Sequence, residues 1–307
     1  MMKKLLSAAF VLSTVASSAF AGAIWHLDPG AVTMKFLSMH ASPRSAAMSG
    51  AGVADPGRAS EVLRNPLAMS VVDNAEFGVN EVIFGDGSSN NLVTAYFGLP
   101  VFDQFTLSMG MDFLGYGDIE GRDENGLETA DYSAYAWALQ AGFGSRSKVF
   151  NWAISMRFAS QTIDDATGFL FGVDAGVSYR VNEYFAFGAT VTNFGYASAY
   201  ESASEDAPLA VQAGISGMIP ILEHWDLHLS TDLYRRADTE TQVLFGGELA
   251  YRETLMLRVG YAVRPDTDDS FSCGLGFTFG MVVFDYGYSP RPALDGGNHY
   301  LTVGIKF

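Results

Sequence analysis

Ten charged or histidine side chains fall on the same side of alternating runs in this sequence, where they would face a shared interior. These residues are Arg157, Asp174, Arg180, Asp226, His228, Asp232, Glu248, Arg258, Arg264 and Asp285. Opposite charges on neighbouring strands can pair across such an interior. The mixture of signs argues against a strongly ion-selective pore. We therefore predict a lumen that is lined by paired charges.

The histidines of the chain, His228 among them, suggest two kinds of chemistry that we weigh and do not favour. Asp226, His228 and Asp232 share one strand face, but a single histidine with two carboxylates is more often a hydrogen-bond network than a metal site. A hydrolase would need a nucleophile beside one of the five histidines, and no serine motif accompanies them. We predict no bound metal, no cofactor and no enzymatic activity.

The runs that present these side chains alternate apolar with polar or small residues and are separated by turns. Phe150, Trp152 and Ile154 alternate with Asn151 and Ala153, for example. Successive strand side chains point to opposite faces, so one face of each run is apolar. Aromatic residues at both ends of many runs fit lipid outside and water inside better than a soluble sandwich.

Counting the runs predicts an all-β fold: a transmembrane antiparallel β-barrel of about 14 strands that follows an N-terminal plug segment. The expected strands are residues 75–84, 91–99, 104–114, 129–143, 149–162, 168–181, 184–195, 208–219, 224–236, 240–252, 254–264, 270–279, 281–289 and 299–307. The connections should alternate between long external loops and short periplasmic turns. No run of ~20 apolar residues follows the leader, so no transmembrane helix is expected.

The chain divides into three predicted parts. Residues 1–21 are a secretory signal peptide, with Lys3 and Lys4 before an apolar stretch and Ala19-Phe20-Ala21 at the cleavage site. Residues 22–72 form the plug segment and residues 73–307 the barrel. Removal of the two leader lysines leaves 16 basic against 34 acidic residues, which makes nucleic acid an improbable partner. The location predicted is the outer membrane of a Gram-negative bacterium after Sec-type export.

Residues 22–72 do not alternate but carry a modest apolar face. We predict that they fold into the barrel; the alternative is a disordered periplasmic arm. A short helix is expected before Asn65, and Asn65-Pro66 should make a turn. The residues with which this segment would close or gate the lumen are Arg44, Met48, Asn65 and Pro66.

Two surface features predict contacts outside the chain. The longest loop, residues 115–131, is strongly acidic, which indicates either a solvated, repulsive surface or a site for divalent cations or a basic partner. The last strand ends in Phe307, and a terminal aromatic is typical of barrels that the barrel assembly machinery recognises. Outer-membrane lipid is the expected partner of the apolar wall.

Three stretches resemble the PorV/PorQ family. Arg44-Ser-Ala-Ala-Met-Ser-Gly-Ala-Gly-Val-Ala-Asp55 followed by Asn65-Pro66 is similar to its amino-terminal signature. Val191-Thr-Asn-Phe-Gly195 and the end of the chain, Phe284 to Phe307, agree as well. Ser49 departs from the usual glycine, and Leu67-Ala68 replaces the usual Ala-Gly. The family is itself similar to FadL channels, whose barrel has fourteen strands and an amino-terminal plug.

The resemblance implies an accessory of type IX protein secretion that binds or transfers exported cargo at the cell surface. Its implied partners are the type IX translocon and the sorting domains of cargo. The alternative is a FadL-like channel for a hydrophobic small molecule, which predicts an apolar pocket under the external loops and an opening in the wall. A purely structural barrel without a substrate is a further alternative.

Overall fold

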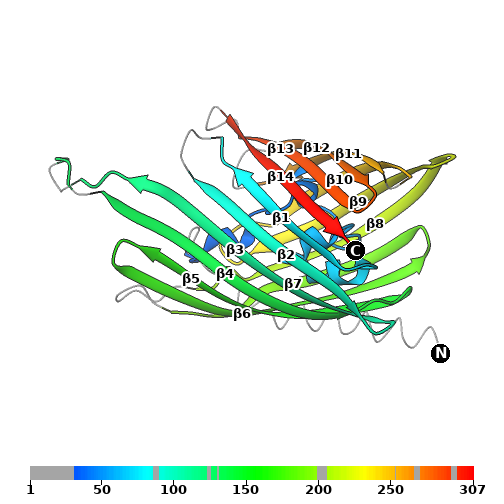
Figure 1. Ribbon diagram of the computed structural model, residues 1–307, viewed down its shortest axis with the longest axis horizontal. Helices are drawn as coiled ribbons and strands as arrows, with labels where there is room; N and C mark the ends of the chain where they lie inside the picture. Colours follow the sequence, from blue (N-terminus) through cyan, green and yellow to red (C-terminus); the bar gives the residue numbers. More distant parts are fainter. Residues whose placement is uncertain are drawn as a thin grey trace.

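Fourteen antiparallel strands close into a barrel in which β1 pairs with β14 (Figure 1). The computed structural model describes residues 31–85, 90–122, 126–129, 131–198, 206–252, 254–265, 270–291 and 296–307. The predicted fold class and strand number are confirmed. The predicted signal peptide, residues 1–21, and the predicted start of the plug, residues 22–30, lie outside the described residues. No helix in the described part of the chain is long and apolar enough to cross a membrane.

The strands are β1 (Glu76–Ile83), β2 (Asn91–Val101), β3 (Phe105–Ile119), β4 (Tyr132–Ser145), β5 (Phe150–Ile163), β6 (Ala166–Asn182), β7 (Phe185–Ala197), β8 (Ala210–Leu222), β9 (Trp225–Arg236), β10 (Gln242–Tyr251), β11 (Leu255–Val263), β12 (Ser270–Phe279), β13 (Val282–Arg291) and β14 (Gly296–Lys306). Along β5, Phe150, Trp152 and Ile154 are exposed on the outer face while Asn151 and Ala153 are buried inside. The apolar face of each strand therefore points outward, as the alternation predicts.

The two ends of the barrel differ in their connections. Tight turns and the carboxyl terminus lie at one end, which we call the terminal end, whereas most of the long connections lie at the other, the loop end. One predicted loop is wrong: β5 and β6 are joined at the loop end by Asp164 and Asp165 alone. Asp164 has a φ of 53°, which aspartate tolerates better than most residues, so the two strands can continue into a tight turn.

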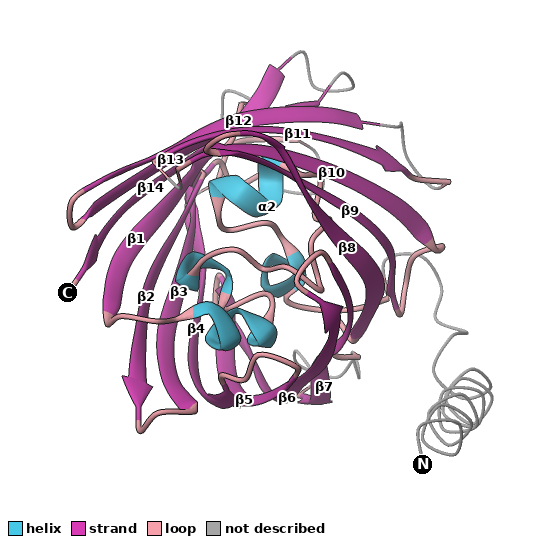
Figure 2. Cartoon of the chain, turned by 90° about the vertical axis from the view of Figure 1, so that its right-hand side faces the viewer, coloured by secondary structure: helices cyan, strands magenta, loops and turns pink. Residues whose placement is uncertain are grey.

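The segment from Val32 to Val72, which we call the plug, lies within the barrel (Figure 2). Its helices are η1 (Lys35–Ser38), α2 (Pro43–Ala47), η2 (Ala59–Glu61) and η3 (Pro66–Val71). Helix α2 packs on β11 to β14, whereas η3 packs on β3 to β6 and η2 on β1 and β2. The plug thus contacts the inner face of the wall on opposite sides of the barrel.

Pro66 begins a helix, whereas the sequence pattern predicts a turn at Asn65-Pro66. The Asn65 side chain accepts a hydrogen bond from the backbone N–H of Leu67 at 3.0 Å and caps η3. Proline has no N–H, and it fits the first position of a helix because an N–H at that position would have no partner within the helix. The same two residues therefore start η3, and the extended φ and ψ of Asn65 supply the change of direction.

Small residues on the inner face of the wall leave room for the plug. Ala136 and Ala138 are fully buried against Phe36 and Leu37 of the plug in one apolar cluster at the loop end. At the terminal end a second cluster joins Leu63 and Met69 to the wall. The interior is therefore packed on the β1 to β6 side, and the sequence signal for it is the run of small residues at inward positions.

Gly260 on β11 lies against the backbone of the plug. A Cβ placed there would lie 2.4 Å from the carbonyl carbon of Met48, whereas one at Gly247 on β10 would meet nothing nearer than 3.6 Å. We expect Gly260→Ala to lower the free energy of unfolding by about 1–3 kcal/mol. Gly247→Ala, the matched control on the lipid side, should stay within about 0.5 kcal/mol of the parent. Urea unfolding in detergent measures both, and equal losses would contradict the close contact.

Ser49, which departs from the family pattern, sits in the left-handed backbone region with a φ of 52°. Glycine adopts this conformation without cost, so a serine there needs compensation. Its hydroxyl lies 2.7 Å from the Ser272 hydroxyl on β12. Serine at this position therefore costs backbone strain that glycine would avoid, but it adds a hydrogen bond between the plug and the wall.

Candidate functional site: the plug contacts and the loop-end cavity

A continuous chain of ion pairs joins the plug to the β9 to β13 side of the wall, and we call it the ion chain. It begins at His228, whose Nδ1 lies 2.9 Å from Asp55 Oδ2. Asp55 lies 3.9 Å from Arg44, and Arg44 Nε lies 3.1 Å from Glu248 Oε2. Two of the ten predicted lumen residues, His228 and Glu248, thus contact plug residues here, and the plug residue that Glu248 contacts is the predicted gate residue Arg44.

The ion chain continues from Glu248 to the plug again. Arg258 Nε lies 2.6 Å from Glu248 Oε2, and the other end of its guanidinium binds Asp285. Asp285 also pairs with Arg58 of the plug at 3.5 Å. Arg258 and Asp285 are almost completely buried, so each charge depends on its neighbours for stabilisation.

The ionisation of the plug acids follows from these contacts. Burial opposes ionisation of Asp55, but the hydrogen bond with His228 and the charge of Arg44 outweigh it, so the pKa of Asp55 is held below its usual value. Burial raises the pKa of Glu61 despite the hydrogen bonds that Ser42 and Ser45 donate to it. Of these two plug acids, Asp55 is therefore the one whose ionised form the ion chain stabilises.

Two further cations fasten the plug to the opposite wall. Arg157 on β5 donates to Asp174 at 2.9 Å, to Asn193 at 2.6 Å and to the backbone carbonyl of Leu63. Arg64 of the plug donates to Asp112 on β3 at 2.8 Å. The plug is consequently held from both sides of the barrel.

Asp232 on β9 binds the plug backbone. Its Oδ2 accepts hydrogen bonds from the N–H groups of Gly52 and Val53, each at 2.8 Å, and from Gln212 at 2.7 Å. Two adjacent N–H groups that converge on one carboxylate form an anion-binding arrangement. Asp232 therefore fixes the turn of the plug that leads to Asp55.

We expect Asp232→Ala to loosen this turn. Hydrogen bonds to a charged group contribute about 1.5–3 kcal/mol each, so amide exchange at Gly52 and Val53 should become roughly tenfold to a hundredfold faster. Asp226→Ala is the control, because Asp226 lies on the same strand and is only half-buried. Hydrogen exchange with mass spectrometry measures both variants. Equal protection of residues 50–55 in the two variants would contradict the assignment.

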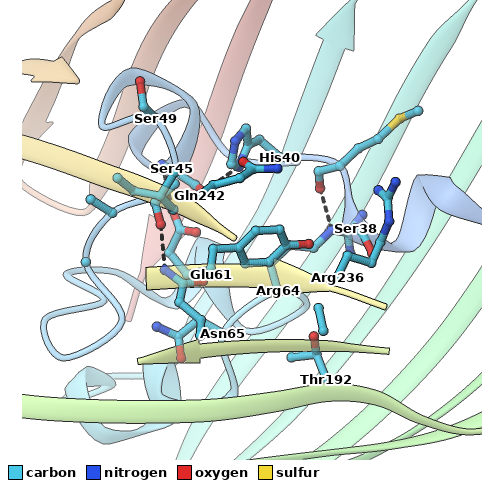
Figure 3. Close-up of a pocket in the computed structure, with 18 of the residues that line it drawn as sticks. Ser38, His40, Ser45, Ser49, Glu61, Arg64, Asn65, Thr192, Arg236 and Gln242 are labelled. Atoms are coloured by element: carbon cyan, nitrogen blue, oxygen red, sulfur yellow. Dashed lines mark hydrogen bonds between the residues drawn. The ribbon is translucent and has the colours of Figure 1, made fainter. Parts of the chain in front are cut away.

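Between the plug and the wall lies a cavity of about 590 Å³, the loop-end cavity (Figure 3). Its plug side includes Lys35, Ser38 and His40, and its wall side includes Arg236 and Gln242. The deeper lining contains Glu61, Arg64 and Asn65. The plug lies beneath it, so the cavity is a pocket rather than a passage through the lumen.

Comparison with known families places the chain. Residues 127–305, more than half of the sequence, match the family described as "Type IX secretion system membrane protein PorP/SprF". The chain belongs to the PorP/SprF family. The resemblance seen in the sequence pointed to PorV/PorQ, which is close, and the PorP/SprF match corrects the name. No curated protein is significantly similar to the chain in sequence.

Solved structures confirm a FadL-like barrel for this PorP/SprF protein. The Ralstonia pickettii toluene transporter TbuX is 14% identical with a TM-score of 0.58, and the match covers 88% of this chain and 99% of that one. The Pseudomonas putida toluene transporter TodX is 10% identical with a TM-score of 0.60, over 88% and 99%. A Pseudomonas aeruginosa FadL homologue is 11% identical with a TM-score of 0.54, over 87% and 98%. These identities establish the fold alone.

The predicted site residues separate into groups in the PorP/SprF structure. Arg264 lines the loop-end cavity and donates to Gln242 at 3.3 Å. Arg180 is exposed at the terminal end beside Arg146, away from the ion chain. Met48 is buried against Gly246 and Gly260. Among the described residues, no group of three or more His, Cys, Asp or Glu side chains is arranged to hold a metal ion. His228 and Asp232, weighed as metal ligands, instead contact the plug.

Sequence reasoning missed two of the plug's cations, Arg58 and Arg64, and several wall partners. Arg58 and Arg64 lie in a segment without periodicity, so no pattern marks them as partners of Asp285 and Asp112. Asp112 could have been found, because it shares the inward register of β3 with Ser108 and Gly110. The acidic-loop prediction falls partly on residues 123–125 and 130, which lie outside the described residues. In the described part of this loop, Arg122 pairs with Glu120 at 3.0 Å.

Proposed function

We propose that this protein is an integral outer-membrane accessory of type IX protein secretion that binds exported proteins, or hands them over, at the cell surface. Membership of the PorP/SprF family supports the connection to secretion. The observation that carries the proposal is the loop-end cavity, which the plug closes from below. A closed lumen with a pocket on the loop side suits a receptor better than a conduit.

Affinity purification of the tagged protein from detergent-solubilised outer membranes tests this function. Co-purification of translocon components, or of exported proteins that share a sorting domain, is the expected result. An unrelated outer-membrane barrel with the same tag is the control for non-specific capture. Recovery of bound apolar molecules without protein partners would contradict the secretion role.

A hydrophobic channel is the second candidate, and the wall favours it at one place. Residues 194–197 of β7 pair with β6, but β8 begins opposite Thr192, so these four residues have no β8 partner among the strand pairs of the described chain. An unpaired stretch of wall is where a small molecule could leave sideways. The loop-end cavity combines charged and polar groups with apolar side chains such as Leu37, Phe84 and Leu244, so its lining is not that of a purely apolar pocket.

A further inference from the structure

The lining of the loop-end cavity has the opposite charge to the protein as a whole. The chain carries a net charge of −16, yet six cationic side chains line the cavity among the described residues and only one acidic one. The cations are Lys35, Arg44, Arg64, Arg157, Arg236 and Arg264, and the acid is Glu61. The Glu61 carboxylate already accepts hydrogen bonds from Ser42 and Ser45. The cavity therefore favours an anionic guest.

The carboxylates that balance these cations stand outside the cavity lining. Three carboxylates of the wall pair with the most buried arginines and do not line the cavity. These pairs are Glu248 with Arg44, Asp112 with Arg64, and Asp174 with Arg157. Near the loop end, Lys35 and Arg236 share the single carboxylate of Asp238, with Lys35 at 3.9 Å. Asp238 is almost completely buried, whereas the Lys35 side chain is 44% exposed. The cationic ends are thus the groups that a guest would meet.

Arg264 lies on the wall of the same cavity, where its contacts include the side chains of Gln242 and Ser270, to which it donates hydrogen bonds. Guanidinium groups bind carboxylates through two parallel hydrogen bonds, which favours arginine at such sites. Hydroxyl and amide groups, including Ser38, Thr239 and Asn298, also line the cavity, beside apolar side chains such as Leu37, Phe84 and Leu244. This set suits a guest that carries a charged end together with apolar groups.

The closed floor of the cavity limits the shape of a polymeric guest. A chain end can enter a pocket that the plug closes from below, whereas the middle of a chain would have to enter and return. Resting on the function proposed above, we propose that the loop-end cavity binds the C-terminal carboxylate of an exported polypeptide through Lys35, Arg236 and Arg264. Capture of a terminal carboxylate is a known mode of peptide recognition.

A matched pair of peptides tests this assignment. The full mature protein in detergent is titrated with a labelled tetra-alanine peptide as the free acid and as the C-terminal amide. We expect the free acid to bind at least roughly tenfold more tightly, which corresponds to about 1.4 kcal/mol. The double variant Arg236→Gln with Arg264→Gln should lose this difference. Arg122→Gln, an exposed loop arginine, should keep it.

Thermal melting first establishes that the variants fold. Equal affinity for acid and amide, no binding of either peptide, or a difference that survives in the double variant would each overturn the proposal. Succinate is titrated in parallel as a free carboxylate: if it binds as tightly as the free-acid peptide, the guest is a small anion and not a chain end. Should exported proteins co-purify while acid and amide bind equally, the secretion role stands and this inference fails.

Discussion

Replacing Arg258 by methionine is expected to lower the free energy of unfolding by about 3–5 kcal/mol, because a buried ion pair that loses one partner leaves an uncompensated charge. Arg258 is fully buried between Glu248 and Asp285, whose side chains are only 9% and 1% exposed, so bulk solvent can stabilise neither carboxylate well. Methionine fills a similar volume, so the loss reports the charge rather than a cavity. Urea unfolding in detergent, followed by tryptophan fluorescence, measures the change.

A second substitution separates charge balance from packing. Adding Glu248→Gln to Arg258→Met restores neutrality, since Arg44 keeps Asp55 and Asp285 keeps Arg58. We expect the double variant to regain a substantial part of the lost stability. Arg122→Met removes an exposed arginine of the loop and should cost less than about 1 kcal/mol. If Arg258→Met lost as little stability as Arg122→Met, the ion chain would not be a stabilising element.

Deleting residues 32–72 is expected to convert a closed barrel into a conducting one. Barrels of eight strands are filled by their own side chains and those of 16–18 strands hold an aqueous channel, so a fourteen-stranded wall without its plug should admit water. Many inward residues are small or charged and would line such a channel. We expect single-channel conductance in planar bilayers to rise at least roughly tenfold over the intact protein.

The variant with Arg44, Arg58 and Arg64 all changed to alanine provides an intermediate case. It keeps the plug but removes its cations, so it should show brief openings between long closed periods. The shift in gel mobility on heating establishes that each barrel is folded before conductance is measured. A folded deletion variant that conducts no better than the intact protein would show that the wall closes without the plug.

The barrel could be predicted from the sequence because strand alternation is a local property. Phe150, Trp152 and Ile154 recur at a period of two, and any pleated strand must place them on one face. The same reasoning placed Arg157, Glu248 and Arg258 inside the barrel, where the structure buries them. The strand limits were less exact, since β3 continues to Ile119 and β5 turns directly into β6.

The contacts of the plug were decided only by the tertiary structure. Asp55 and His228 are 173 residues apart in the sequence, and Arg44 and Glu248 are 204 apart. A segment without periodicity carries no register that could assign these partners, and Pro66 could begin a helix or make a turn until its neighbours were in place. The wall depends on a pattern that repeats along the chain, whereas the plug depends on single contacts that exist only once the barrel has closed around it.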